Sequence, residues 1–249
     1  MKRHSICRLT ALLLLALVAA SGCKKEMNAT EVPPDVSKNA SRKTHFDTIP
    51  LSTSPSARGF YEEKTTMLFG NAQTDGTIYP YRQFIAGRWT VKGIWYTYRS
   101  IFFTTLPIAS GDPNILKSAK LVLFSDPHPV GNGDQVHANS GTSNAFYIRR
   151  VTSSLNITTI NQFNWFNQPT VTTVNQVLVP HTNQPFQDLQ IDLTAMMKQV
   201  IAEGPTIGAL GLMAQLQNET NSYNIRIFCS TDQPDASRKP YLVLEYYDM

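Results

Sequence analysis

The side chains best suited to recognition chemistry lie between residues 79 and 95, where aromatic and basic residues are interleaved. The aromatic members are Tyr79, Tyr81, Trp89 and Trp95, and Arg88 lies among them. Aromatic rings offer a broad apolar face to the C–H side of a pyranose ring, and polar or charged groups hydrogen-bond its hydroxyls. The segment therefore predicts a glycan-binding platform at these five residues, and its positive charge would suit an acidic glycan.

A second interpretation of the same rings stays open. Trp and Tyr are largely buried on average, so these side chains could instead fill the core of the fold. Trp89 and Tyr81 are the members that we expect to be exposed. Trp165, in Trp165-X-X-X-Pro169, is expected to be packed.

A polar loop between residues 126 and 137 could hold a metal. Its side chains are Asp126, His128, Asn132, Asp134 and His137. Carboxylate and amide oxygens suit calcium, whereas two imidazoles suit zinc. The spacing matches neither a calcium loop nor a zinc signature. Calcium at Asp126 and Asp134 is therefore the alternative to a simpler expectation, a polar surface loop and no cofactor.

No local motif for catalysis is present. The chain lacks Gly-X-Ser-X-Gly, His-Glu-X-X-His and a phosphate-binding loop. The expectation is a protein that is not an enzyme. A polysaccharide lyase stays an alternative, because its Tyr, His, Arg and Lys need not be neighbours in sequence.

The N-terminal segment predicts export and lipid anchoring. Residues 1–8 are basic, residues 10–20 are apolar and too short to span a bilayer, and the segment ends in Val18-Ala-Ala-Ser-Gly-Cys23. Small residues before a cysteine are typical of a lipobox, and several acyl tails on Cys23 would anchor the chain stably. An ordinary signal peptide with an incidental cysteine is the alternative. The predicted location is the outer membrane of a Gram-negative bacterium, at its surface or periplasmic face.

Charge and composition limit the classes of partner that we expect the chain to bind. The signal peptide, residues 1–22, holds three basic residues and no acidic one, so its removal lowers the formal net charge from +4 to +1. That charge gives no case for nucleic acid. Residues 23–57 are rich in Pro, Ser, Thr and Asn and predict a flexible linker. Cys229 would remain as the one unmodified cysteine, in a strand and inert.

The elements that would position the candidate site residues are mostly short strands within residues 58–249. Apolar and β-branched runs predict strands at 65–69, 93–106, 115–124, 145–151, 171–179, 186–191, 207–216, 224–228 and 241–246. Turn signals about every ten residues favour an all-β jelly-roll sandwich.

One short helix interrupts this pattern. Its apolar stripe recurs at helical spacing and consists of Leu193, Met196, Met197, Val200 and Ile201. Asp192 and Thr194 are expected to cap its start, and Gly204 to end it.

Several blocks taken in order resemble a known family. They are Tyr98-Arg-Ser-Ile-Phe-Phe103, Ile115-Leu-Lys-Ser-Ala-Lys-Leu-Val-Leu-Phe124, Tyr147-Ile-Arg-Arg-Val151, Trp165-X-X-X-Pro169, Ile191-Asp-Leu-Thr194, Gly208-X-X-Gly-Leu212, Phe228-Cys-Ser230 and the segment 238–246. This succession, over residues 65–247, resembles the DNRLRE domain of bacterial and archaeal cell-surface proteins. The resemblance implies a jelly-roll module of the carbohydrate-binding type, associated with surface polysaccharides that include acidic glycans. The chain departs from the family in its aromatic insertion at residues 79–95.

Two functions follow as expectations. The first is a lipid-anchored protein whose sandwich binds a cell-surface or extracellular polysaccharide. The second is a structural or adhesion protein of the cell surface that takes no soluble ligand. Exposure of Trp89 and Trp95 would favour the first, and their burial the second.

Overall fold

The computed structural model describes residues 44–50, 59–64, 83–91, 94–104, 106, 111–129, 137–154, 163, 165, 167–204, 210–231 and 233–247. All of them belong to one compact unit, residues 41–249. The predicted signal peptide and Cys23 lie outside the described residues. So do Tyr79, Tyr81 and Asp134 and the strand expected at 65–69.

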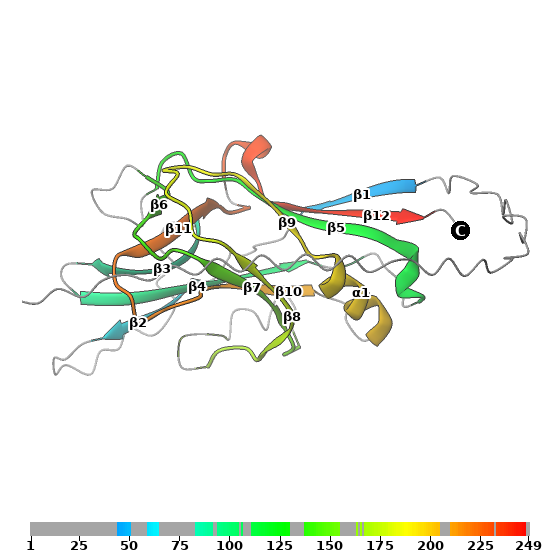
Figure 1. Ribbon diagram of the computed structural model, residues 1–249, viewed down its shortest axis with the longest axis horizontal. Coiled ribbons are helices and arrows are strands. Elements are labelled where there is room, and N and C mark those ends of the chain that lie inside the picture. The colour runs from blue at the N-terminus through cyan, green and yellow to red at the C-terminus, as the bar shows by residue number, and fades with distance from the viewer. Residues whose placement is uncertain are drawn as a thin grey trace, which may run out of the picture. The chain divides into compact units, whose positions relative to one another are not determined.

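The described chain is a sandwich of two antiparallel sheets (Figure 1). The smaller sheet has the order β1 (Thr44–Pro50), β12 (Tyr241–Tyr247), β5 (Leu116–Leu123) and β9 (Leu189–Asp192). The larger sheet has the order β6 (Asn139–Ser140), β11 (Asn224–Cys229), β3 (Gln83–Val91), β4 (Ile94–Thr104), β10 (Leu210–Leu216), β7 (Phe146–Val151) and β8 (Val171–Val179). An eighth strand, β2 (Gly59–Lys64), also pairs with β4. Short 3-10 helices lie at Pro113–Ile115 and Ala236–Arg238.

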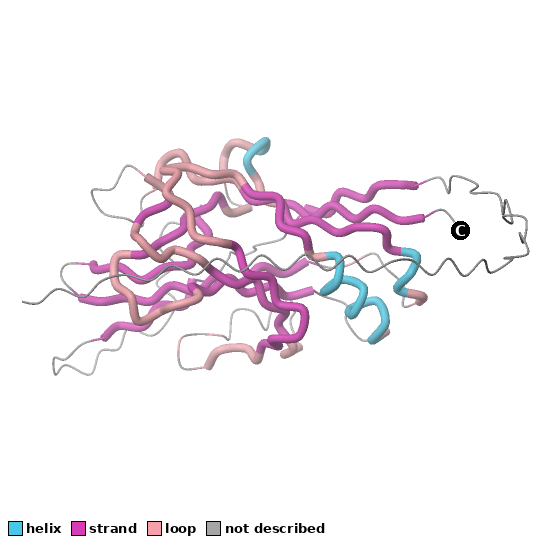
Figure 2. The backbone as a smooth tube through the Cα atoms, viewed as in Figure 1, coloured by secondary structure: helices cyan, strands magenta, loops and turns pink. Residues whose placement is uncertain are grey.

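The chain passes repeatedly between the two sheets of the sandwich. The chain starts in the smaller sheet at β1 and returns to it at β5, β9 and β12, visiting the larger sheet between these strands. As a result the first and last described strands are neighbours, and buried side chains of β3, β4, β10 and β7 pack against those of β5, β9 and β12 between the sheets. Figure 2 shows how strands dominate the described chain. The predicted all-β sandwich with one short α-helix is confirmed.

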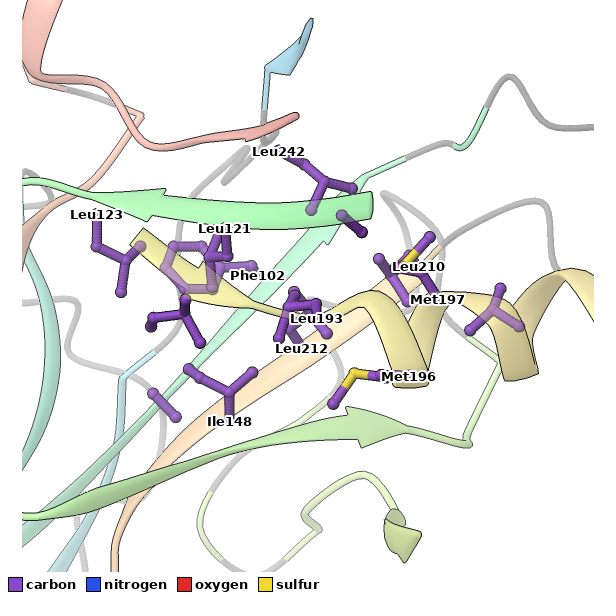
Figure 3. Close-up of a cluster of buried hydrophobic side chains, with 14 of the residues drawn as sticks. Phe102, Leu121, Leu123, Ile148, Leu193, Met196, Met197, Leu210, Leu212 and Leu242 are labelled. Carbon is purple, nitrogen blue, oxygen red and sulfur yellow. The ribbon is translucent and has the colours of Figure 1, made fainter. Parts of the chain in front are cut away.

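A single large hydrophobic cluster joins the two sheets. Its side chains include Phe102, Ile148 and Leu212 of the larger sheet and Leu121 and Leu242 of the smaller one (Figure 3). Each of these is at most 1% exposed. Burial of such side chains supplies about 25 cal/mol per Å² of apolar surface and is the main source of stability.

The helix α1 (Thr194–Glu203) packs its predicted stripe into this core. All five stripe residues are buried, and the helix contacts β5 and β8. Asp192 Oδ1 accepts a hydrogen bond from the Thr194 N–H at 2.8 Å. Thr194 Oγ1 instead accepts from the Ala119 N–H, so it ties the helix to β5 rather than capping it. Gly204, with φ 87°, ends the helix as predicted.

Four strands were not expected from the sequence, and two of them are the short strands β2 (Gly59–Lys64) and β6 (Asn139–Ser140). Residues 44–50, assigned above to the linker, form β1 and pair along their whole length with β12, so this part of the linker prediction is corrected. Residues 83–91 form β3, a central strand of the larger sheet. The remaining strands, β4, β5 and β7 to β12, fall where they were predicted, within a few residues. Within the described part of the chain, no helix has both the length and the apolar character needed to cross a membrane.

Candidate functional site

The β3–β4 hairpin brings three of the predicted glycan-binding residues together. Trp89 lies opposite Tyr96, Thr90 opposite Trp95, and Arg88 opposite Thr97. A hairpin holds such residues in fixed register, because opposite side chains are only about 5 Å apart at Cβ. Trp89, Trp95 and Arg88 are therefore positioned by the backbone of two paired strands.

Both indole rings contact Tyr223, which precedes β11. The ring centroid of Tyr223 lies 5.2 Å from that of Trp89 and 4.8 Å from that of Trp95, with edge-on geometry in each case. Both Trp side chains are half-buried, whereas Tyr223 is 50% exposed. We call Trp89, Trp95 and Tyr223 the aromatic cluster.

One side of the Trp89 ring packs against the interior of the fold. It packs against a small cluster of buried residues that includes Ile85, Tyr98, Ile225 and Ile227. Such packing locks a ring in one orientation and leaves only part of it available to a ligand. Trp95 and Tyr223 are therefore the members of the aromatic cluster that are free of this apolar packing.

Arg88 lies inside the hairpin rather than on the surface. Its side chain is 6% exposed, and Nη1 donates to Thr97 Oγ1 at 3.1 Å and to the Glu219 carbonyl at 3.0 Å. Its guanidinium carbon is 5.7 Å from the centroid of the Trp95 ring, a cation–π contact. This burial gives Arg88 a supporting position under the aromatic cluster, in place of the direct ligand contact that the sequence suggested.

A second arginine holds the loop that carries Tyr223. Arg99 Nε donates to Glu219 Oε1 at 2.7 Å, and Nη2 donates to Glu219 Oε2 at 2.5 Å. The Arg99 guanidinium also lies 4.8 Å from the centroid of the Trp165 ring, which packs against a buried cluster around Ile101 as predicted. Bidentate pairing fixes geometry more strictly than a single contact does. Glu219 thus links the loop 217–223 to both arginines of the hairpin.

Asp126, one of the two carboxylates of the metal candidate, takes part in a local turn. Asp126 is 3% exposed, and its Oδ1 accepts from the His128 N–H at 2.8 Å, a turn stabilised by its own side chain. Among the residues that the structure describes, no group of three or more His, Cys, Asp or Glu side chains lies close enough to hold a metal ion. Asn132 and Asp134 are outside that set.

Tyr223 is the member of the cluster that sequence patterns missed. It sits in Asn221-Ser-Tyr-Asn224 with φ 61°, a left-handed conformation that is uncommon for a non-glycine residue. A lone aromatic residue inside a polar turn is the signal that would have pointed to it.

Comparison with known proteins adds no family to this picture. None of the family models searched matches the chain, and a search of curated proteins finds no significant match. The function must therefore be argued from the site itself.

Proposed function

We propose that this chain is a surface-anchored lipoprotein whose β-sandwich binds polysaccharide. The observation that carries this proposal is the aromatic cluster, in which a half-exposed tyrosine and two tryptophans from three separate elements meet. The proposal includes a lipid at Cys23, a non-catalytic domain of the DNRLRE type and a position in the outer membrane.

Stacking, rather than charge, would bind a sugar at this cluster. Arg88 is buried against Thr97 and Glu219, and the Arg99 guanidinium is paired with the Glu219 carboxylate. Neither arginine presents a free positive charge next to the rings. The cluster is therefore best suited to the C–H face of a sugar ring, whether or not the polymer carries acidic groups elsewhere.

A structural or adhesion role is the second candidate. It is favoured by the packing of Trp89 against the buried cluster around Ile225 and by the internal use of Arg88. Under that reading the rings stiffen the hairpin and no soluble ligand binds there.

Affinity electrophoresis of the purified full-length protein through gels containing β-glucan, xylan, mannan or polyuronate separates the two candidates. Trp95→Ala is the test variant, and Phe186→Ala is the control because Phe186 is 42% exposed on another loop. We expect the wild type and the control to be retarded by at least one polymer and Trp95→Ala to migrate freely. Equal retardation of Trp95→Ala would remove the aromatic cluster as the site, and no retardation of the wild type in any gel would favour the structural role.

A further inference from the structure

The edge of the larger sheet carries a pronounced irregularity between β7 and β8. Ile148 pairs with Val177 and Arg150 with Thr172, so Arg149 alone faces residues 173–176 of β8. Bulges of this kind re-aim side chains and are common beside functional sites. Within the bulge, Asn175 has φ 56°.

The helix holds this bulge in place. Asn175 Nδ2 donates to Gln199 Oε1 of α1 at 2.8 Å. A non-glycine residue in this conformation is energetically unfavourable, so surrounding contacts must offset its cost. The distortion directs the next residue, Gln176, toward Arg149.

Arg149 is held between two glutamine side chains and a tyrosine ring. Its Nε donates to Gln176 Oε1 and its Nη1 donates to Gln215 Oε1, each at 2.8 Å. Its guanidinium carbon lies 4.7 Å from the centroid of the Tyr147 ring. All four side chains are half-buried, so the group is ordered by the sheet and still reaches solvent.

The chemistry of these contacts fixes which atoms face outward. A guanidinium can only donate, so each glutamine must turn its carbonyl oxygen to Arg149 and its NH₂ group away from it. Among the described residues, neither glutamine NH₂ group nor Arg149 Nη2 has a hydrogen-bond partner. The outward-facing groups are therefore all donors.

The charge of Arg149 also has no counterpart. Three other arginines of the described chain are paired with carboxylates, Arg99 with Glu219, Arg150 with Glu203 and Arg238 with Asp188. Arg88 and Arg226 donate instead to neutral oxygens, but both are buried, whereas Arg149 reaches solvent. No carboxylate pairs with Arg149 within the described residues. A preorganised set of donors with one uncompensated positive charge is complementary to an oxyanion.

We propose that Arg149, Gln176 and Gln215 form a binding site for an oxyanion carried by an acidic glycan, either the carboxylate of a uronic acid or a sulfate ester. Tyr147 lies opposite both Gln215 and Leu178, and Leu178 is 44% exposed. These two side chains supply an apolar surface beside the donors for the carbons of the sugar ring. The oxyanion site is on β7, β8 and β10, and it does not depend on the aromatic cluster of β3 and β4.

Isothermal titration of the purified full-length protein tests this site with matched oligosaccharides: an oligouronate, a sulfated oligosaccharide and a neutral oligoglucoside. The main variant is Gln176→Glu, which keeps the shape of the side chain, pairs with Arg149 and cancels its charge. Gln190→Glu is the control. Gln190 is exposed on β9 of the other sheet, and its replacement by Glu changes the net charge by the same amount as Gln176→Glu does. Arg149→Gln removes the charge by a second route.

We expect one of the two acidic oligosaccharides to bind, and the stronger of them identifies the oxyanion. Both Gln176→Glu and Arg149→Gln should weaken that binding about tenfold or more, whereas Gln190→Glu should leave it unchanged. Binding of acidic oligosaccharides that survives both site variants, or no binding of either acid by the folded wild type, would overturn the proposal. Acidic binding that stays intact in Trp95→Ala, while neutral-glycan binding is lost, would support the proposal, because it would place the two ligands at separate sites.

Discussion

Tyr223 lies edge-on against Trp95, with ring centroids 4.8 Å apart and an interplanar angle of 68°. Trp95 is held by a strand pair, whereas Tyr223 extends from the loop 217–223. The shape of the aromatic cluster therefore depends on how firmly that loop is fixed to the hairpin.

Replacing Tyr223 should affect binding more than stability. Tyr223→Ala removes a ring that is 50% exposed, so we expect a small change in melting temperature. It also removes one of the stacking surfaces, and we expect affinity for the retained polysaccharide to fall about tenfold. Tyr223→Phe keeps the ring and should keep most of the affinity. Titration calorimetry would measure both, and equal binding by Tyr223→Ala would place the ligand elsewhere.

Glu219 should be important for the order of the loop. Glu219→Gln exchanges the bidentate carboxylate of a pair whose side chains are 20% and 19% exposed, and we expect a loss of about 1–2 kcal/mol in unfolding free energy. Hydrogen exchange in residues 217–223 should quicken. Lys117→Met breaks an ion pair on the smaller sheet, where Lys117 is 42% exposed, and serves as the control with little effect expected. Unchanged exchange in the loop would show that Arg99 does not hold it.

Asp192 should make the start of α1 sensitive to acid. Hydrogen bonds from the Thr194 side chain and backbone lower the pKa of Asp192 below its ordinary value of 3.8. The unfolded chain therefore takes up a proton first as the pH falls, and the stabilisation is complete above that value and lost as the pH drops through the folded pKa. At pH 7 the free energy of unfolding of the wild type should exceed that of Asp192→Asn by on the order of 0.5 kcal/mol. Urea unfolding at stepwise lower pH should show the gap closing, and a gap independent of pH would contradict this reading.

Arg226 carries a fully buried charge, and we expect that the protein can lose this charge without losing stability. It is 0% exposed, desolvation lowers its pKa to about 10, and its Nε has no hydrogen-bond partner among the residues that the structure describes. It packs over Phe146 and Phe228, with the guanidinium carbon 5.4 and 5.5 Å from the ring centroids.

The corresponding substitutions separate packing from charge. Arg226→Met keeps the apolar length and removes the buried charge, so we expect unfolding free energy to be equal or higher by up to about 2 kcal/mol. Arg226→Ala leaves a cavity and should lose about 2–4 kcal/mol. Urea unfolding measures both, and a large loss in Arg226→Met would mean that the hydrogen bonds to Pro180 and Gln187 outweigh the cost of burial.

Local patterns were sufficient for most strands and for the helix, because their apolar residues recur at the period of the element. The strand β3 lacked that signal, since its two faces are both buried around Gly87 and Arg88. A Cβ atom at Gly87 would lie 2.5 Å from Ile225 Cγ1, so close approach to β11 requires glycine where a strand pattern would call for a larger residue. β1 was missed for another reason: among the described strands it pairs with β12, which lies at the far end of the chain.

The sequence predicted some residues of the candidate sites but not the partners that surround them. Trp89 and Trp95 stood out because aromatic residues cluster locally. The partners that define their environment come from far along the chain, since Glu219 is 131 residues from Arg88. The same holds for Arg149 and Gln215, which are 66 residues apart. No periodicity links such positions, and only the strand order of the sheet brings them together.

The pairing of β1 with β12 determines where a pulling force at the N-terminal side of the sandwich would act first. Tension applied at Thr44 acts directly on β1, which lies at the edge of the smaller sheet and pairs with β12 among the described strands. Detaching its seven residues would lengthen the molecule by about 20 Å while leaving β12 paired with β5. A protein held at its N-terminal end and gripping a polymer with the larger sheet would thus possess a short, reversible extension that absorbs load before the core is pulled apart.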